Sequence, residues 1–275
     1  MTQMFLIGEG ITHSLSPAMW NHYLEKVGST IRYSLRDVSE HELPAVLDEI
    51  RSGDVFAANV TMPHKGWAAR SADETSHTVR RTGAANLLVP GDRVRAENTD
   101  VIGARMILQR RAPYRTVLVL GAGGTASALT DALRGLAEHL LVANRTRSRA
   151  DVLAERIRED FAGVTVIDWD HRNDVASNAD LVISSVPTVD TVPVDPQRLG
   201  THAVVYDAIY RNTPTVFQRA LADRGVAMAD GLSHLAAQAI AMFDLLGLEP
   251  YPSFLVEGLE RATGREVAAF GEPIS

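Results

Sequence analysis

The chain has 275 residues, of which 45% are hydrophobic and 22% charged, so it is long enough to bury a sizeable core in one or two domains. A formal net charge of -7 and dispersed arginines leave no basic surface for nucleic acid. Because the sequence has no cysteine, disulfides and thiolate metal sites are excluded. No secretory signal and no apolar stretch long enough to cross a bilayer is visible, so we expect a cytoplasmic enzyme or binding protein.

Segments typical of strands alternate with helical patterns through the first hundred residues. After a strand at 4–8, a helix at 16–28 has Ser16 as its candidate N-cap, Pro17 in its first turn and Gly28 at its end. The series continues as strand 31–38, helix 41–53, strand 56–61, helix 64–81 and a strand pair, 85–90 and 93–100, across a Gly-Asp turn. This order predicts an α/β domain at residues 1–101.

A second alternating series follows a helix at 101–111. It begins with the strand and glycine-rich turn of 116–124 and continues as helix 124–136, strand 139–144, helix 148–160, strands 164–168, 180–186 and 203–210, helix 214–224 and strand 226–230. Short apolar strands separated by helices predict a parallel, doubly wound sheet of the Rossmann type. We place this second α/β domain at residues 102–234.

The glycine-rich turn is the clearest local motif. Gly121, Gly123 and Ala126 have the G-x-G-x-x-A spacing between a strand and a helix, and Gly124 lies in the same turn. Backbone without side chains lets a pyrophosphate approach the helix N-terminus, so the motif predicts a dinucleotide site. A glycine-rich turn that binds no nucleotide remains the alternative.

The end of the next strand indicates which dinucleotide is bound. The acid that contacts the ribose of NAD is missing there, and Asn144, Arg145, Thr146 and Arg149 take its place. These residues suit an adenosine 2′-phosphate, so the predicted cofactor is NADP. A solvated helix start is the alternative, although clustered cations at a helix N-terminus oppose the macrodipole and favour a compensating anion.

Polar side chains follow several strands and turns of the first domain. They are Ser14, Ser16, Asn59, Thr61, Lys65, Asn86, Asn98, Thr99 and Asp100. Each alone is more often a turn former or a cap. Because the carboxyl ends of strands in an open α/β sheet face one crevice, we expect a site in which Lys65 and Asp100 form a titratable pair.

Lys65 is unusual in its own right, because Lys26 is the only other lysine among 27 basic residues. Arginine does not release its proton at accessible pH, whereas a lysine beside an aspartate can exchange one. Chance is the alternative, and Lys26, expected on a solvated helix, illustrates it. The histidines show no metal-ligand spacing, so we expect no metal.

Together these motifs resemble the shikimate and quinate dehydrogenase family over nearly the whole chain. The matching segments, in the family's order, are SLSP, NVTMPHK, GAANLLV, ENTDVIG, GAGGTA, NRTRSRA, YDAIYRNTPT and DGLSHLAAQAIAMFDLLG. The resemblance implies an N-terminal substrate domain, a Rossmann domain and C-terminal helices, residues 235–275, that pack back on the substrate domain.

The resemblance also implies roles for single residues. Ser14 and Ser16 match residues that bind the substrate carboxylate. Residues that contact its hydroxyls match Thr61, Lys65, Asn86, Asp100 and Gln238. Lys65 and Asp100 match the acid/base pair, and the glycine turn with residues 144–149 matches the NADP site. Tyr210 and Gly231 match positions that line the nicotinamide and substrate crevice.

The implied activity is NADP-dependent interconversion of a ring ketone and alcohol on a cyclohexene or cyclohexane carboxylate. Shikimate and 3-dehydroshikimate, intermediates of aromatic amino acid biosynthesis (the chorismate pathway), are the first expectation, in a monomer or homodimer. Quinate, an aminated analogue and a non-catalytic metabolite-binding relative stay open.

Three positions depart from the family pattern. Leu87 replaces a threonine, residues 184–186 read SSV in place of NAT, and His234 replaces a methionine. The alignment puts His234 near the nicotinamide, although a single histidine is more often a surface or packing residue. The departures bear on the choice of substrate more than on the chemistry.

Overall fold

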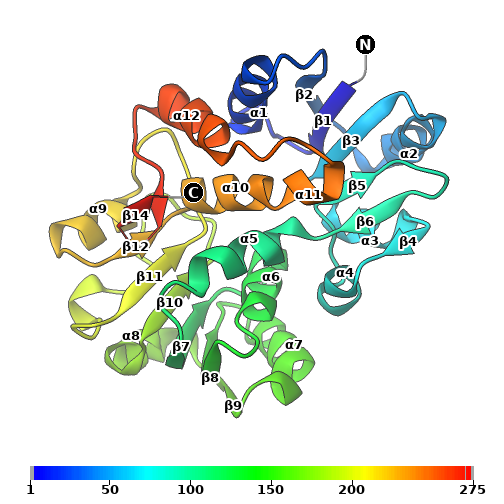
Figure 1. The fold of residues 1–275 in the computed structure, drawn as a ribbon. Helices are drawn as coiled ribbons and strands as arrows, with labels where there is room; N and C mark the ends of the chain where they lie inside the picture. Colours follow the sequence, from blue (N-terminus) through cyan, green and yellow to red (C-terminus); the bar gives the residue numbers. More distant parts are fainter. Residues whose placement is uncertain (1–2, 270, 274–275) are drawn as a thin grey trace. The chain divides into compact units, whose positions relative to one another are not determined.

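The computed structural model describes residues 3–269 and 271–273 and separates them into two compact units (Figure 1). The first unit comprises the chain up to Ile102 together with Gln238–Glu266. The second unit comprises Gly103–Ala237 and two short C-terminal strands. The helices α5 (Thr99–Leu108) and α10 (Gly231–Ile240) carry the chain from one unit to the other.

The first unit contains a six-stranded sheet in the order β2-β1-β3-β5-β6-β4. Its strands are β1 (Gln3–Gly8), β2 (Arg32–Asp37), β3 (Val55–Val60), β4 (Glu74–Thr75), β5 (Leu87–Val89) and β6 (Arg95–Glu97). β1 pairs in parallel with β2 and β3, whereas β5 and β6 form the predicted antiparallel pair. The carboxyl ends of β1, β2 and β3 therefore lie at one edge of the sheet.

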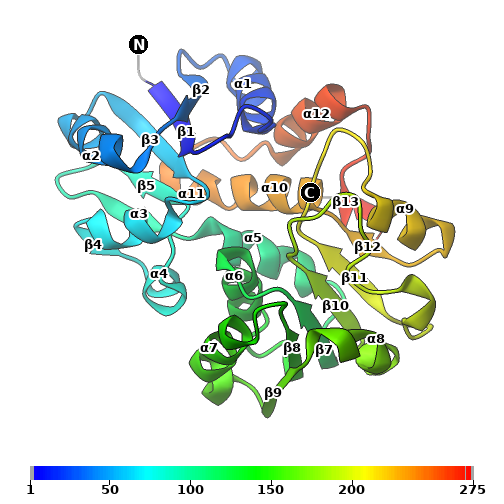
Figure 2. The same cartoon turned by 180° about the vertical axis from the view of Figure 1, so that it is seen from behind.

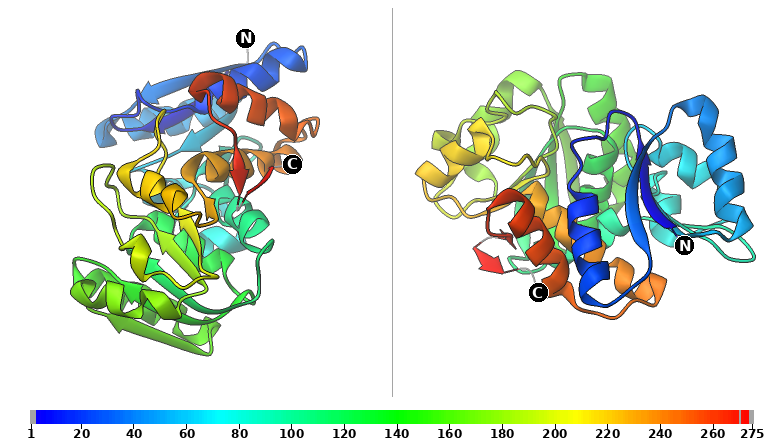
Figure 3. Two further views of the ribbon diagram at one scale, coloured as in Figure 1. Left: turned by 90° about the vertical axis from the view of Figure 1, so that its left-hand side faces the viewer. Right: turned by 90° about the horizontal axis from the view of Figure 1, so that it is seen from above.

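Helices cover the sheet of the first unit, which also contains the short 3-10 helix η1 (Glu40–Glu42). The helices are α1 (Ser16–Lys26), α2 (Leu43–Ser52), α3 (Lys65–Ser71), α4 (His77–Thr82), α11 (Met242–Leu246) and α12 (Pro252–Thr263). Figure 3 shows α1 and α12, far apart in the sequence, lying side by side. A Cβ built at Gly258 of α12 would lie 2.9 Å from the Cα of Met19, so this close crossing depends on glycine.

The prediction of a single helix at 64–81 is wrong, because the strand β4 divides this segment into the two helices α3 and α4. Asp73 donates its backbone N–H to the carbonyl of Val94 at 2.9 Å, and Ser76 donates to that of Ala96 at 3.1 Å. These bonds place β4 beside β6 and leave two short helices, and the second begins at a serine cap, Ser76. Long-range backbone pairing therefore overrides the local helical pattern.

The second unit contains a sheet in the order β14-β13-β12-β11-β10-β7-β8-β9 (Figure 2). Its parallel strands are β7 (Tyr114–Leu120), β8 (Ala137–Ala143), β9 (Gly163–Ile167), β10 (Leu181–Ser184), β11 (Val204–Asp207) and β12 (Met228–Ala229). Numbered along the chain, these six strands lie in the order 3-2-1-4-5-6 of the Rossmann fold. The order reverses between β7 and β10, which is the switch point where such folds bind nucleotides.

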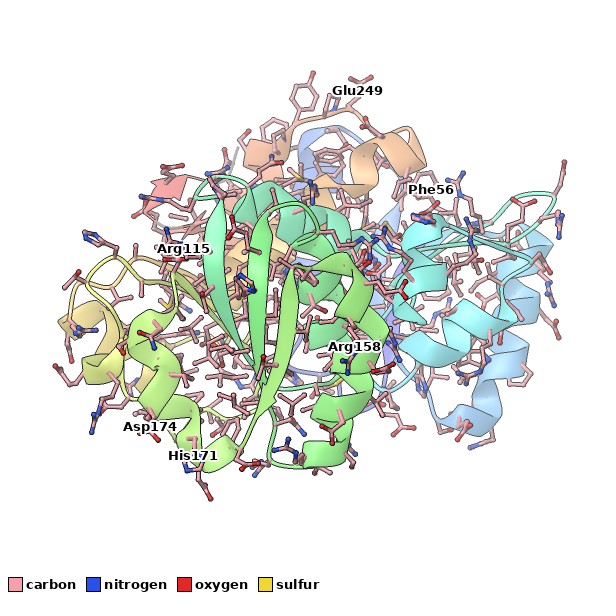
Figure 4. The ribbon with its side chains drawn as sticks, turned by 90° about the horizontal axis from the view of Figure 1, so that it is seen from below. Phe56, Arg115, Arg158, His171, Asp174 and Glu249 are labelled. Atoms are coloured by element: carbon pink, nitrogen blue, oxygen red, sulfur yellow. The ribbon has the colours of Figure 1, made fainter. Side chains whose placement is uncertain are left out.

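Helices and an apolar core complete the second unit. Its helices are α6 (Gly124–Ala132), α7 (Arg147–Ile157), α8 (Arg172–Val175) and α9 (Val216–Asp223), with 3-10 turns η2 (Arg158–Asp160), η3 (Trp169–His171), η4 (Ala176–Asn178) and η5 (Pro196–Arg198). Figure 4 shows β7, β8 and β9 with Arg115 near the start of β7 and Arg158 just beyond α7. Phe217 and Leu221 of α9 are buried against the sheet, and burial of each stabilises the unit by roughly 1.5–3 kcal/mol.

The C-terminal strands correct one prediction. The family resemblance predicts that residues 235–275, of which 270, 274 and 275 lie outside the described residues, form helices that pack on the first domain, and α12 does belong to the first unit. However, β13 (Ala268–Ala269) and β14 (Glu272–Pro273) extend the sheet of the second unit, because Ala269 pairs with Ala229 of β12.

Among the described residues, no helix combines the length and the apolar composition that a membrane span requires.

Candidate active site

A lysine and an aspartate form an ion pair in the first unit. Lys65 is the first residue of α3, directly after the turn that follows β3, and Asp100 lies in the first turn of α5. The Lys65 Nζ atom lies 2.6 Å from Asp100 Oδ2, with 19% of the lysine side chain and 9% of the aspartate side chain exposed. A charge-assisted hydrogen bond that is this short and this sheltered holds both groups in one geometry.

The amide of Asn86 holds the other oxygen of the aspartate. Asn86 lies just before β5, is buried, and donates from Nδ2 to Asp100 Oδ1 at 2.9 Å. Its Oδ1 accepts the backbone N–H of Thr99 at 2.7 Å, which fixes the first residue of α5. One side chain thus positions both the helix and the carboxylate that the helix carries.

Gln238 joins the same cluster from α10. Its Oε1 accepts from Asn86 Nδ2 and from Thr99 Oγ1, each at 3.2 Å. The structure therefore brings together Lys65, Asn86, Asp100 and Gln238, which the sequence proposed for one site. Thr99, named in the sequence only as a polar residue at a turn, completes the network.

Asn59 connects this network to the sheet through a hydrogen bond to the backbone of Asn86. Tyr33 donates its hydroxyl to Asn59 Oδ1 at 2.9 Å, and Asn59 Nδ2 donates to the backbone carbonyl of Asn86 at 3.2 Å. Because both ends of its amide have partners within the protein, Asn59 holds Asn86 in place.

The two serines of the SLSP motif lie together at the start of α1. Ser14 Oγ and Ser16 Oγ are 3.2 Å apart, and Ser14 Oγ accepts the backbone N–H of Ser16 at 3.3 Å. The prediction that Ser16 caps the helix is wrong, because Leu15 is the N-cap residue and Ser16 is already helical. Paired hydroxyls at a helix N-terminus suit a carboxylate.

Thr61, the first residue after β3, is half-buried beside the end of β1. Its backbone N–H donates to Ile7 O at 2.9 Å, and its methyl carbon would lie 2.5 Å from a Cβ built at Gly8. Gly8 thus lets the two strand ends approach. Within the described residues, no hydrogen bond joins Ser14 or Ser16 to the cluster around Lys65.

The glycine turn of the second unit has the geometry of a phosphate site. Gly121 has φ +108, and a Cβ built there would lie 2.4 Å from Ser185 Oγ, so only glycine fits. Gly123 is the N-cap of α6 and makes no side-chain cap, and nothing lies within 4 Å of a Cβ built at Gly123 or Gly124. Ala126, in the first turn, is fully buried. The N–H groups that begin α6 are therefore left for an anion.

The arginines at the start of α7 fall into two kinds. Arg147 forms ion pairs with Asp168 and, at 3.8 Å, with Asp151. Arg145 and Arg149 are exposed, and neither pairs with an acid among residues 3–269 and 271–273. Two unpaired cations where the helix dipole is positive need an external anion to offset them.

Asn144 and Thr146 shape the same turn. Asn144 Nδ2 donates to the backbone carbonyl of Thr146 at 2.8 Å, and Thr146 is the N-cap of α7 without a side-chain cap. The cluster predicted to hold the 2′-phosphate therefore lies together on one turn, after the strand β8.

Gly231 and Tyr210 lie in close backbone contact. A Cβ built at Gly231 would lie 2.7 Å from Ala208 O and 2.8 Å from the backbone nitrogen of Tyr210. Glycine at 231 is thus required for the first residue of α10 to approach the segment that follows β11. Tyr210 itself is half-buried.

His234 has a buried partner that sequence reasoning missed. Its Nδ1 atom lies 2.7 Å from the hydroxyl of Tyr206, which is fully buried in β11, and the two rings meet edge to face. When the tyrosine donates this bond, the proton of the neutral imidazole is on Nε2. His234 is therefore held in a set orientation.

Asp207 and Gln218 were also missed, although both are polar residues within otherwise apolar segments. Gln218 Nε2 donates to Asp207 Oδ2 at 2.9 Å, and both side chains are buried. Burial raises the pKa of Asp207 to about 6, while the hydrogen bond from Gln218 lowers it. An isolated polar residue in an apolar pattern was the available signal, but it does not identify its partner.

No cluster of three or more histidine, aspartate or glutamate side chains that could hold a metal ion occurs within the described residues.

The strand order of the second unit and its uncapped glycine turn define the class of Rossmann-type dinucleotide-binding proteins, here with a separate α/β unit. Residues 6–88 match the model of the shikimate dehydrogenase substrate binding domain, and residues 103–195 match that of shikimate / quinate 5-dehydrogenase. The chain belongs to the shikimate and quinate dehydrogenase family. The family and the α/β fold class expected from the sequence motifs are thereby confirmed.

Individual relatives agree along most of the chain. A shikimate dehydrogenase (NADP(+)) of Jannaschia sp. (strain CCS1) is 33% identical over 251 residues, which are 87% of this chain and 89% of the relative. The crystal structure of shikimate 5-dehydrogenase from Thermus thermophilus, in complex with NADP(H) and shikimate, has a TM-score of 0.84 at 30% identity and covers 95% of this chain and 100% of its own. Quinate dehydrogenase from Corynebacterium glutamicum, in complex with NAD, has a TM-score of 0.85 at 27% identity and covers 94% and 99%.

Proposed function

We propose that this protein is an NADP-dependent shikimate dehydrogenase that interconverts 3-dehydroshikimate and shikimate. The observation that carries the proposal is the sheltered Lys65–Asp100 pair within the Asn86 and Gln238 network. A protein that only binds a metabolite has no need of a titratable pair held at 2.6 Å, and this argues against a non-catalytic relative. The activity belongs to aromatic amino acid biosynthesis and would be carried out in the cytoplasm.

The reaction divides between cofactor and protein. The nicotinamide, when bound, supplies the hydride to the ring ketone. Lys65 donates a proton from Nζ to the carbonyl oxygen as negative charge develops on it, and in the reverse direction neutral Lys65 accepts the proton of the alcohol. Asp100 stays next to the lysine and holds its Nζ atom in place through the 2.6 Å contact. Asn86 holds the second carboxylate oxygen, so Oδ2 is kept toward the lysine.

Substrate anchoring is assigned to the polar groups of the first unit. Ser14 and Ser16 hold the carboxylate, and Thr61, Asn86 and Gln238 contact ring hydroxyls. Gln238 accepts two hydrogen bonds through Oε1, which hold its amide beside Asn86 and Thr99. Tyr210 is proposed as a further substrate-binding residue.

Cofactor binding is assigned to the second unit. The turn of Gly121, Gly123, Gly124 and Ala126 receives the pyrophosphate at the start of α6, and Gly231 lies at the nicotinamide end. Asn144 and Thr146 shape the turn on which Arg145 and Arg149 bind the 2′-phosphate. Because these arginines have no acidic partner among the described residues, NADP is favoured over NAD.

Quinate oxidation is the second candidate, supported by the likeness to a quinate dehydrogenase in complex with NAD. The two candidates make opposite predictions for the cofactor, because the unpaired arginines would be of no use to NAD. We propose a monomer or a homodimer, without a nucleic-acid partner.

The test is purified protein incubated with shikimate, quinate or an aminated analogue, together with NADP+ or NAD+, followed by the absorbance of the reduced nicotinamide. We expect the largest kcat/KM for shikimate with NADP+. A preference for quinate with NAD+ would replace the assignment by the second candidate, and no reduction with any ring acid would reject a dehydrogenase of this kind.

A further inference from the structure

The connection between β11 and α9, residues 208–215, is anchored by a single buried side chain. Gln218 lies in the first turn of α9, and only 1% of it is exposed. An amide buried to this extent must find all of its hydrogen-bond partners within the protein.

The amide of Gln218 reaches three separate points of the chain. Nε2 donates to Asp207 Oδ2 at 2.9 Å and to the backbone carbonyl of Ile209 at 2.8 Å. Oε1 accepts the backbone N–H of Thr215 at 3.2 Å, and the Thr215 hydroxyl accepts the backbone N–H of Gln218 in return. Both hydrogens of Nε2 are thereby used, and the two ends of the connection are tied to one side chain.

The opposite side of the same connection packs against α10. A Cβ built at Gly231 would lie 2.7 Å from Ala208 O and 2.7 Å from the carbonyl carbon of Ile209. The N–H of Gly231 points to Ile209 O at 3.4 Å. Contact with Gly231 therefore stops the segment from moving toward α10, and Gln218 stops it from moving away.

We propose that Gln218 is a positioning residue of the dehydrogenase, which fixes the backbone of Ala208–Tyr210 through Asp207 and Ile209 and so sets the place of Tyr210. The part of this inference that concerns catalysis rests on the proposed function. The part that concerns the Asp207–Gln218 contact does not, and the two can be tested separately.

Asp207 offers a direct readout of the contact. It is 2% exposed and faces Ser184 at the end of β10, Gln218 of α9 and the carboxylate of Asp230, which follows β12. Asp230 Oδ1 accepts from the backbone N–H groups of Leu232 and Ser233, so its charge is used to cap α10. Burial and the charge of Asp230 raise the pKa of Asp207, and the Gln218 amide opposes them.

The experiment compares the wild-type protein with Gln218→Leu, which keeps the size of the side chain and removes the amide. The titration of Asp207 is followed by NMR of its carboxyl carbon and assigned with Asp207→Asn. We expect the midpoint to rise above the wild-type value of about 6, because the contact that favours the carboxylate is lost. We also expect kcat for shikimate oxidation to fall roughly tenfold, the effect of a misplaced group, with little change in KM for NADP.

Thr215→Val is the matched control. It removes the hydroxyl that caps α9 but leaves both donations from Gln218 Nε2, so it should lower the melting temperature without moving the midpoint or kcat. If Gln218→Leu does not fold, Gln218→Asn takes its place, because the shorter amide withdraws from Asp207 and must shift the midpoint in the same direction.

A midpoint unchanged in the folded variant would overturn the proposal, as would a Thr215→Val protein with the same shift. A shifted midpoint with unchanged kcat would retain the contact and overturn its positioning role. If no ring acid is oxidised by the wild type, the proposed function fails, while the titration still decides whether Gln218 holds Asp207.

Discussion

Lys65 shows how much depends on the chemical type of one residue. The chain has 25 arginines and two lysines, and one of the two forms the sheltered pair with Asp100. An arginine could keep the charge and the contact with the carboxylate. It could not release a proton at accessible pH, which is the step assigned to this position.

We therefore expect Lys65→Arg to fold and to bind NADP as the wild type does, but to lose turnover by roughly 10²–10⁴-fold. The measurements are kcat for shikimate oxidation and thermal unfolding. Lys26→Arg is the control, because Lys26 is an exposed residue whose nearest acid, Glu257, is 3.9 Å away. A Lys65→Arg enzyme within a few-fold of wild type would show that position 65 supplies charge alone.

Of the two serines, Ser16 offers the cleaner test of the proposed carboxylate site. Ser14 accepts a backbone N–H, whereas the hydroxyl of Ser16 forms a hydrogen bond only with Ser14 Oγ among the described residues. Ser14→Ala thus affects the start of α1 as well as the proposed carboxylate site. Ser16→Ala avoids most of that effect.

For Ser16→Ala we expect KM for shikimate to rise roughly tenfold, the loss of one hydrogen bond to a charged group, with the Kd of NADP unchanged. Steady-state kinetics and cofactor titration by fluorescence measure the two quantities. An unchanged KM would remove Ser16 from the carboxylate site.

At the scale of the element, the start of α7 separates arginines that serve the fold from arginines that are free to serve a ligand. Arg147 is neutralised by Asp151 and Asp168, whereas Arg145 has no acidic partner within the described residues. The two arginines are two positions apart on the same turn, which makes them a matched pair.

Arg145→Ala should weaken NADP binding by roughly 1.5–3 kcal/mol, because a charge-assisted contact with the 2′-phosphate disappears, and should leave NAD binding nearly unchanged. Arg147→Ala should affect both cofactors little. Isothermal titration calorimetry of both variants with both cofactors gives the comparison. Equal losses for NADP and NAD in Arg145→Ala would mean that the arginine does not contact the 2′-phosphate.

At the scale of the whole molecule, one buried carboxyl makes stability depend on pH. Asp207 has its pKa raised from 3.8 to about 6 by burial, so between these values the native state binds a proton that the unfolded state does not. The contribution of Asp207 to the free energy of unfolding therefore falls as pH rises from 3.8 to 6. Above pH 6 the whole of this reduction, on the order of 3 kcal/mol, is present.

Glu49 and Asp73 act in the opposite direction. Hydrogen bonds with Arg36 and with the Val94 backbone lower the pKa of these two carboxyls, so their contributions are present at neutral pH and are lost in acid. Since Asp207→Asn removes only the Asp207 effect, comparing it with the wild type isolates that effect.

We expect Asp207→Asn to gain stability relative to the wild type as pH rises from 4 to above 6, when urea unfolding is measured at a series of pH values. The difference should level off above pH 7. Unfolding free energies that stay parallel over this range would mean that Asp207 does not titrate with a raised pKa.

Features that repeat along the chain or are local could be predicted from the amino-acid sequence. The alternation of strands and helices predicted two α/β units, because each short apolar strand needs a helix to cover it. The glycine spacing predicted a turn of bare backbone between a strand and a helix, and the φ of +108 at Gly121 agrees with a position that favours glycine. The positions of Lys65, Asn86 and Asp100 after strands and turns, with the family motifs, predicted their meeting.

Features that depend on contacts between distant segments could not be predicted and are visible only in the folded protein. β4, β13 and β14 are each two residues long, which is too short for a periodic pattern. They form because β4 pairs with β6, β13 pairs with β12 and β14 pairs with β13. Three further facts could not be predicted. The sequence does not show which of Ser14 and Ser16 supports α1, or which arginine near the start of α7 is neutralised. Nor does it show that Gln218 contacts Asp207. A hydrogen bond in a buried site depends on where two side chains are brought by the fold, whereas a sequence shows only that each of them needs a partner.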